Sequence, residues 1–113
     1  MHELALSESI VQLVLECARS ENLHAVTRVT LEVGAGAGVE AEALRFCFDI
    51  VSADTPAQGA ELRIETVPLR GRCLRCAAEF EPASLVDSCP TCGAYAPELL
   101  SGRELRVKSL DGE

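Results

Sequence analysis

Two helical patterns of apolar residues occupy the first half of the chain. Between residues 4 and 21, apolar positions recur at helical spacing, while Glu8, Gln12 and Glu16 form a separate polar row. The first apolar stripe comprises Leu6, Ile10, Leu13, Val14 and Cys17. The second stripe comprises Leu44, Cys47, Phe48 and Val51. These patterns predict two amphipathic helices, and they place Cys17 and Cys47 in the core as small apolar side chains.

Three shorter segments alternate between apolar and polar residues, as half-buried strands do. Their apolar residues are Val29, Leu31 and Val33, then Leu62 and Ile64, and finally Leu105 and Val107. A strand, a helix and a second strand in this order predict a parallel pair of strands joined by a right-handed crossover. Because an isolated terminal strand is not stable, the third strand is expected at the edge of the same sheet. The predicted fold class is α+β, with two helices on a three-stranded sheet.

A glycine-rich segment, residues 34–38, connects the first strand to the second helix. It reads Gly-Ala-Gly-Ala-Gly and lacks the Gly-Lys-Ser/Thr ending of a phosphate-binding P-loop. We therefore expect a flexible connection at this place rather than a nucleotide site.

Both kinds of periodicity disappear between residues 69 and 100, a segment that contains four of the six cysteines. Because the strand pattern returns afterwards, this segment is predicted to be a zinc-ribbon-like subdomain inserted into the α/β-type domain. The expected domains are therefore residues 1–68 with 101–113, and residues 69–100.

Cysteine spacing gives the strongest chemical signal in the chain. Cys73 and Cys76 form one Cys-x-x-Cys pair, and Cys89 and Cys92 form a second pair after 12 intervening residues. Two such pairs supply four thiolates to one tetrahedral site, which suits Zn(II), and a closed shell of this kind is structural. Iron in a rubredoxin-like electron carrier is the main alternative, since the same ligands also suit iron. A disulfide framework is the second alternative.

Charge and hydropathy restrict the class of function. The chain has 113 residues, with 10 Lys and Arg against 18 Asp and Glu, and a formal net charge of -8. This balance disfavours nucleic-acid binding, because contacts to phosphates need clustered Lys and Arg side chains. It therefore also disfavours a zinc-ribbon module that acts in transcription. No apolar run approaches the length of a membrane span, and the first residues do not resemble a signal peptide. A reducing cytoplasmic location is expected, where cysteines serve as ligands or buried thiols.

The first residues, Met1, His2 and Glu3, offer a second set of metal ligands. The terminal amine, the His2 backbone amide and the His2 imidazole can chelate in fused rings, a planar nitrogen set that suits Ni(II) or Cu(II). Glu3 can fill a further position, and Glu40 is a candidate outer ligand. Because His2 must be neutral to bind, affinity should fall as the pH drops through the imidazole pKa of about 6.5.

The chain resembles the HypA/HybF family in three places together: Met1-His2-Glu3, the cysteine quartet, and the segment 102–107 with Gly102, Glu104, Leu105 and Val107. The resemblance covers essentially the whole chain. It implies a nickel metallochaperone that delivers Ni(II) for maturation of [NiFe] hydrogenase and, in some organisms, supplies urease. It also implies nickel binding at Met1, His2 and Glu3, and structural zinc at the quartet.

The partners implied by this resemblance are the hydrogenase large-subunit precursor, the accessory GTPase of nickel insertion, and urease accessory proteins. No arrangement of nucleophile, base and oxyanion-stabilising groups is visible, so an enzyme is not expected. The second cysteine pair continues with Gly93-Ala94, where family members often have Gly-Ser, and residues 69–100 contain no histidine. A nickel ligand from the zinc-binding domain is therefore not expected.

Overall fold

The structure is a computed structural model that describes residues 3–113 of the chain. These residues form two compact units. The first unit contains the described residues up to Glu32, together with Val39–Glu65 and Arg106–Glu113, and the second contains Val33–Gly38 and Thr66–Leu105.

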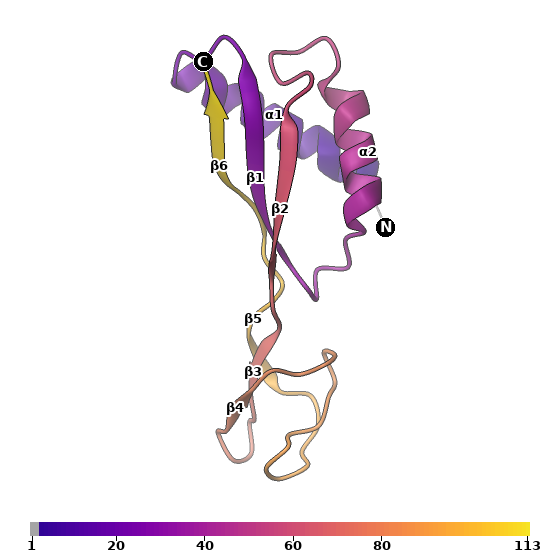
Figure 1. Cartoon of the computed structure of the whole chain (residues 1–113). Coiled ribbons are helices and arrows are strands. Elements are labelled where there is room, and N and C mark those ends of the chain that lie inside the picture. The colour runs from indigo at the N-terminus through magenta and orange to yellow at the C-terminus, as the bar shows by residue number, and fades with distance from the viewer. Residues whose placement is uncertain (1–2) are drawn as a thin grey trace. The chain divides into compact units, whose positions relative to one another are not determined.

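The first unit contains two helices and a three-stranded sheet (Figure 1). Its elements are α1 (Glu3–Ser20), β1 (Val26–Gly34), α2 (Ala41–Ser52), β2 (Glu61–Val67) and β6 (Leu105–Gly112), the strands continuing into the second unit at one end. The strand order is β2-β1-β6, and in Figure 1 β1 and β2 run in the same direction while β6 runs in the opposite one. The predicted α+β fold and the edge position of the last strand are therefore confirmed.

The core of this unit lies between the helices and the sheet. Its largest fully buried apolar side chains are Val14, Val29, Leu31, Leu44 and Phe48. Removing a side chain of this size from water stabilises the fold by roughly 1.5–3 kcal/mol. The predicted stripes of the two helices thus supply much of the observed core.

The prediction for the first helix was wrong about which side faces the core, because the buried stripe of α1 is displaced by about one residue from the predicted stripe. The residues that α1 buries include Ser7, Val11 and Ala18, whereas Leu13 is 45% exposed and Cys17 is partly exposed. Ser7 lies against α2, where its hydroxyl donates to the Leu44 carbonyl oxygen at 3.4 Å. The side of α1 that carries Leu13 and Cys17 thus faces away from the core.

Cys47 also lies outside the fully buried core, because α2 directs Leu44 and Phe48 inward and leaves Cys47 at intermediate exposure. The expectation that Cys17 and Cys47 are both core residues is therefore corrected. Each lies at the margin of its apolar stripe, where a small side chain is tolerated in partial contact with solvent.

The glycine segment is held by backbone contacts, in contrast to the flexible connection expected from its sequence. Backbone N–H groups of Gly34, Ala35 and Gly36 donate to carbonyl oxygens of Glu104, Val67 and Gly102 at 2.6–2.8 Å. A Cβ atom on Gly34 would lie 2.1 Å from the Gly102 carbonyl carbon. Glycine is therefore required here because two backbone segments approach too closely for a side chain.

The second unit contains an antiparallel sheet of three short strands, in the order β4-β3-β5. These strands are β3 (Arg70–Arg72), β4 (Glu79–Phe80) and β5 (Glu98–Ser101). The sheet is small, and two of the residues that the unit buries, Cys73 and Cys89, are members of the quartet. This arrangement matches the zinc-ribbon-like subdomain predicted from the sequence.

Neither described helix is both long and apolar enough to cross a membrane.

Two buried serines of the first unit allow a paired test of the packing. Ser52 is 1% exposed, and its hydroxyl has no hydrogen-bond partner among the described residues, whereas the Ser7 hydroxyl has one. Ser52→Ala should raise the free energy of unfolding by about 1 kcal/mol, because it removes an unsatisfied polar group. Ser7→Ala should lower it by about 1 kcal/mol. Urea denaturation of both variants measures the difference, and a destabilised Ser52→Ala would contradict the assignment.

Candidate metal centres

Two similar backbone turns present the four cysteines. In the first turn, the Ala77 N–H donates to the Cys73 carbonyl oxygen at 2.9 Å. In the second, the Gly93 N–H donates to the Cys89 carbonyl oxygen at 2.8 Å. Both donors have a positive φ, 64° for Ala77 and 79° for Gly93, which closes the turn after each pair. Ala77 adopts this conformation at a cost of about 1 kcal/mol that Gly93 avoids.

These turns also direct backbone N–H groups at sulfur. The Arg75 and Cys76 N–H groups lie 3.3 and 3.4 Å from Cys73 Sγ. The Thr91 N–H lies 3.4 Å from Cys89 Sγ in the corresponding place. Donors in these positions favour the thiolate over the thiol, so the peptide backbone prepares both sulfurs to bind a cation.

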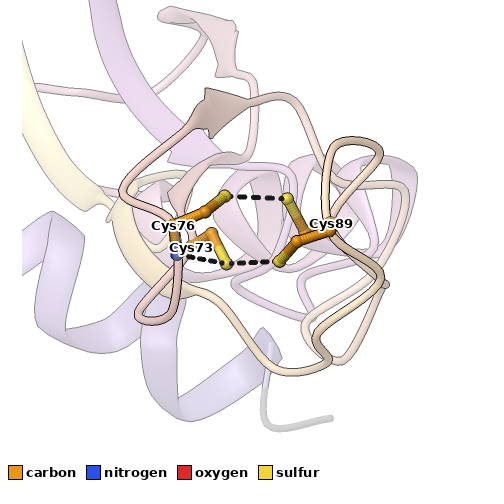
Figure 2. A group of neighbouring side chains, drawn as sticks. Cys73, Cys76 and Cys89 are labelled. Atoms are coloured by element: carbon orange, nitrogen blue, oxygen red, sulfur yellow. Dashed lines mark hydrogen bonds between the residues drawn. The ribbon is translucent and has the colours of Figure 1, made fainter.

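The sulfur atoms of the quartet point toward one another and lie close enough to share one metal ion (Figure 2). All of them lie within 4.8 Å of one another, with Cys73 Sγ 3.4 Å from Cys92 Sγ and Cys76 Sγ 3.6 Å from Cys89 Sγ. Tetrahedral zinc with Zn–S bonds of about 2.3 Å separates its sulfurs by about 3.8 Å. The sulfurs are too far apart for disulfides, and all six cysteines are free. The quartet therefore suits a single tetrahedral cation.

Proton affinities differ strongly within this cluster. The Cys92 N–H, followed by the Thr91 N–H, lowers the pKa of Cys89 to about 6 against the opposing effect of burial. The Cys76 N–H, followed by the Arg75 N–H, lowers the pKa of Cys73. For Cys76 itself, the Ala78 N–H lowers the pKa, but burial and the neighbouring sulfurs outweigh it and raise the value to about 12. A divalent cation that binds among these sulfurs would therefore compete with protons, because only the thiolate form is a metal ligand.

The candidate nickel ligands are only partly within the described structure. Met1 and His2 lie outside the described residues. Glu3 is the first residue of α1 and is 9% exposed, and its Oε2 accepts a hydrogen bond from the Glu40 N–H at 3.3 Å. The structure therefore brings together Glu3 and Glu40, which lie 37 residues apart in the chain.

Glu40 has a structural contact that the sequence analysis did not identify. It is the N-cap residue of α2, and its two carboxylate oxygens accept from the Glu42 and Ala43 N–H groups at 3.3 and 2.6 Å. A glutamate is not among the usual N-cap residues, so composition alone gives little indication of this role. Glu42 lies in the first turn of α2 and forms an ion pair with Arg45 at 2.8 Å.

Together, the fold and the quartet define a small two-unit α+β protein that can hold a metal ion in a four-cysteine centre. Residues 1–112 match the family described as "Hydrogenase/urease nickel incorporation, metallochaperone, hypA". The chain therefore belongs to the HypA family.

Curated relatives match over the whole chain. Proteins named "Hydrogenase maturation factor HypA" from Albidiferax ferrireducens and Geobacter metallireducens are each 44% identical over 113 residues and are covered completely. The protein of the same name from Azoarcus sp. is 46% identical over 110 residues, which are 97% of this chain and 96% of that protein.

Two solution structures have the same fold. The nickel metallochaperone HypA from Helicobacter pylori aligns with a TM-score of 0.71 at 24% identity, covering 99% of this chain and 97% of its own. A second HypA protein aligns with a TM-score of 0.74 at 23% identity, covering 100% and 97%. At these identities the likeness supports the fold.

Loss of one quartet sulfur should remove the bound metal. Cys73→Ser should reduce the zinc content from about one equivalent to near zero, because a closed tetrahedral site needs all four thiolates. It should also destabilise the second unit, since binding at such a site contributes folding free energy. Metal analysis and limited proteolysis between residues 66 and 105 measure the two effects.

Cys17→Ser is the matched control, because Cys17 lies outside the quartet and is partly exposed. Its metal content and protease resistance should equal those of the unsubstituted chain. An unchanged zinc content in Cys73→Ser would contradict the four-sulfur site. If the purified protein is coloured and contains iron, the quartet is an iron site rather than a zinc site.

Proposed function

We propose that this protein is a nickel metallochaperone that delivers Ni(II) for maturation of [NiFe] hydrogenase and also supplies urease. The observation that carries the proposal is the family match over residues 1–112, whose description names nickel incorporation into both enzymes. The names of the curated relatives agree with the hydrogenase role. The protein acts as a carrier rather than as an enzyme.

We assign the nickel donors to Met1, His2 and Glu3. The terminal amine, the His2 amide and the His2 imidazole provide nitrogen, and the Glu3 carboxylate provides oxygen, a set that suits Ni(II). The hydrogen bond from the Glu40 N–H to Glu3 Oε2 supports this assignment, because it fixes the carboxylate at the start of α1. Glu40 then acts by positioning Glu3, while its own carboxylate caps α2.

The quartet of Cys73, Cys76, Cys89 and Cys92 is assigned to structural Zn(II). Its closed shell leaves no ligand position for the cargo. The proposed domains accordingly separate the two metals, with nickel in residues 1–68 and 101–113 and zinc in residues 69–100. Six free cysteines are consistent with the reducing cytoplasm that we propose as the location.

The proposed partners follow from the proposed cargo. The client is the hydrogenase large-subunit precursor, and an accessory GTPase and urease accessory proteins act in the same delivery. A chaperone must release its metal as well as bind it, and nitrogen and oxygen donors permit this by stepwise ligand exchange with the recipient. Nucleic acid is not a proposed partner, since the net charge is -8.

Removal of the nitrogen donors tests the cargo site. His2→Ala should weaken nickel binding about 100-fold, because it removes the imidazole that closes the chelate. An extension placed before Met1 should weaken it similarly, because it converts the amine into an amide. Competition with a chromogenic nickel chelator measures both affinities, while metal analysis follows zinc.

His24→Ala is the matched control, since His24 is the other histidine of the chain and is exposed. Nickel affinity and zinc content should both be unchanged in this variant. Unaltered nickel affinity in the extended protein would exclude the terminal amine as a ligand, and unaltered affinity in His2→Ala would overturn the site.

Two substitutions separate the charge of Glu3 from its hydrogen bond. Glu3→Gln keeps an acceptor for the Glu40 N–H but removes the negative charge, so nickel affinity should fall about tenfold with little change in thermal stability. Glu3→Ala removes both, and should lower affinity and stability together. If the affinity of Glu3→Gln equals that of the unsubstituted chain, Glu3 acts through its hydrogen bond and is not a ligand.

A further inference from the structure

Each turn of the quartet contains one buried and one more exposed cysteine. Cys73 and Cys89, the first cysteines of the two turns, are both 3% exposed. Of the second cysteines, Cys76 is exposed and Cys92 is partly exposed. A small solute in the surrounding water therefore has readier access to the second cysteine of each turn than to the first.

Sulfur contacts join the two turns crosswise. Cys76 Sγ lies 3.6 Å from Cys89 Sγ (Figure 2), and Cys73 Sγ lies 3.4 Å from Cys92 Sγ. Each contact thus joins the more exposed cysteine of one turn to the buried cysteine of the other. We call these two contacts the crosswise pairs. Neither is a disulfide in this structure, but sulfurs already in contact need only a small further approach to form one.

The backbone holds the buried member of each crosswise pair in position. Cys73 Sγ accepts from the Arg75 N–H at 3.3 Å. Cys89 Sγ accepts from the Thr91 N–H at 3.4 Å. As metal ligands all four sulfurs are thiolates, and the thiolate is also the form that attacks an oxidised sulfur. Each buried sulfur is thus a fixed nucleophile in contact with the sulfur that an oxidant in solution meets first.

Pairing within each turn is the alternative. A disulfide between Cys73 and Cys76 would join residues three positions apart and leave the two turns unconnected. The crosswise pairs join residues 19 and 13 positions apart, and so connect the two turns as a bound metal does. A cross-link that closes a longer loop removes more freedom from the unfolded chain. Crosswise disulfides would therefore keep the two turns together after the metal is lost.

We propose that Cys76 and Cys92 are sites of oxidation by hydrogen peroxide, and that this oxidation converts the quartet into two crosswise disulfides. Disulfide sulfurs are not thiolates, so the bound cation is released. The proposal rests on the structural zinc assigned to the quartet and does not depend on nickel.

The chemistry of each pair is a two-electron oxidation. The Cys76 thiolate attacks one peroxide oxygen, the O–O bond breaks, and the departing hydroxide takes a proton from solvent, which leaves a sulfenic acid on Cys76. The Cys89 thiolate then attacks the Cys76 sulfur, the S–S bond forms, and the second hydroxide also leaves as water. Two sulfurs lose two electrons in total, and one peroxide gains them. Cys92 and Cys73 react in the same way.

Release of zinc is the first measurement. The variant Cys17→Ser/Cys47→Ser is used throughout, because it keeps the quartet and removes the other two cysteines. With a chromogenic zinc chelator present, complete release should consume about two peroxide molecules per zinc ion, one for each disulfide. Dithiothreitol followed by zinc should restore the original metal content.

Two outcomes of this measurement have different meanings. A zinc content that excess peroxide leaves unchanged would overturn the proposed oxidation. A chain that contains no zinc before peroxide is added would overturn the metal assignment on which the proposal rests. Neither outcome bears on nickel binding.

Peptide mapping distinguishes crosswise pairs from pairs within a turn. Trypsin cleaves after Arg75 and glutamyl endopeptidase after Glu79, which places Cys73 and Cys76 on two separate peptides and both cysteines of the second turn on a third. Without reduction, crosswise pairing should join all three peptides in one species. Tandem mass spectrometry then shows which cysteine of the third peptide holds each of the other two. Pairing within the turns would instead join the first two peptides to each other, and this result would overturn the proposal.

Trapping with dimedone, which reacts with sulfenic acids, tests the order of the steps. With less than one equivalent of peroxide, the label should be found on Cys76 and Cys92. It should be at least about tenfold lower on Cys73 and Cys89, because both are buried. A label mainly on the buried cysteines would contradict the assigned sites.

Limited proteolysis between residues 66 and 105 tests whether the disulfides replace the metal. The oxidised, zinc-free chain should resist cleavage about as well as the zinc-loaded chain, because the two turns remain connected. A chain stripped of zinc by a chelator under reducing conditions should be cleaved about tenfold faster or more. Equal cleavage of the oxidised and the stripped chains would overturn the proposed replacement.

Discussion

Electrostatic repulsion among four closely spaced thiolates is the constraint on which the second unit depends. The sulfurs lie within 4.8 Å of one another, and backbone N–H groups lower the pKa of Cys89 while burial and the neighbouring sulfurs raise the pKa of Cys76. A divalent cation bound among the four sulfurs would take the place of protons and convert this repulsion into attraction. The short strands β3, β4 and β5 bury little apolar surface, so a cation bound at the quartet would stabilise them by supplying folding free energy.

The first unit is stabilised differently, by an apolar core and by close contact between its helices. Ser7 of α1 bonds to Leu44 of α2, and the start of each helix is joined to the other through Glu3 and Glu40. Glu40 serves two purposes, because its carboxylate caps α2 while its N–H holds Glu3. The helix pairing that builds the core thereby also positions the carboxylate that we assign to nickel.

The sequence predicted the features that depend on local pattern. Alternation located β1, β2 and β6, and the spacing of Cys73, Cys76, Cys89 and Cys92 identified the metal centre, because both signals arise from neighbours along the chain. The orientation of α1 was not predictable in this way. It depends on contacts such as that of Ser7, whose small size matters only once α2 is packed against it.

The prediction of a flexible connection at residues 34–38 was wrong for a related reason. Its composition indicates freedom in an isolated chain, but the close approach of Gly34 to Gly102 becomes visible only when residues 68 positions apart are brought together. The capping role of Glu40 likewise follows from where α2 begins rather than from residue preference. Such wrong predictions are informative, because they identify apolar residues of α1 that were expected in the core and lie outside it.

The two proposed metal centres differ in the property that matters most for a carrier, which is the ease of ligand exchange. Four sulfurs in a closed tetrahedron leave no position from which an incoming ligand can displace one of them, so the quartet retains its metal. Nitrogen and oxygen donors drawn from one short segment can be replaced one at a time by a recipient protein. Retention of the proposed zinc ion at residues 73–92 and exchange of the proposed nickel ion at residues 1–3 therefore need different ligands. The two proposed ligand sets lie in different parts of the sequence. A single centre could not combine both properties, because the closed shell that supports the second unit would also withhold the cargo.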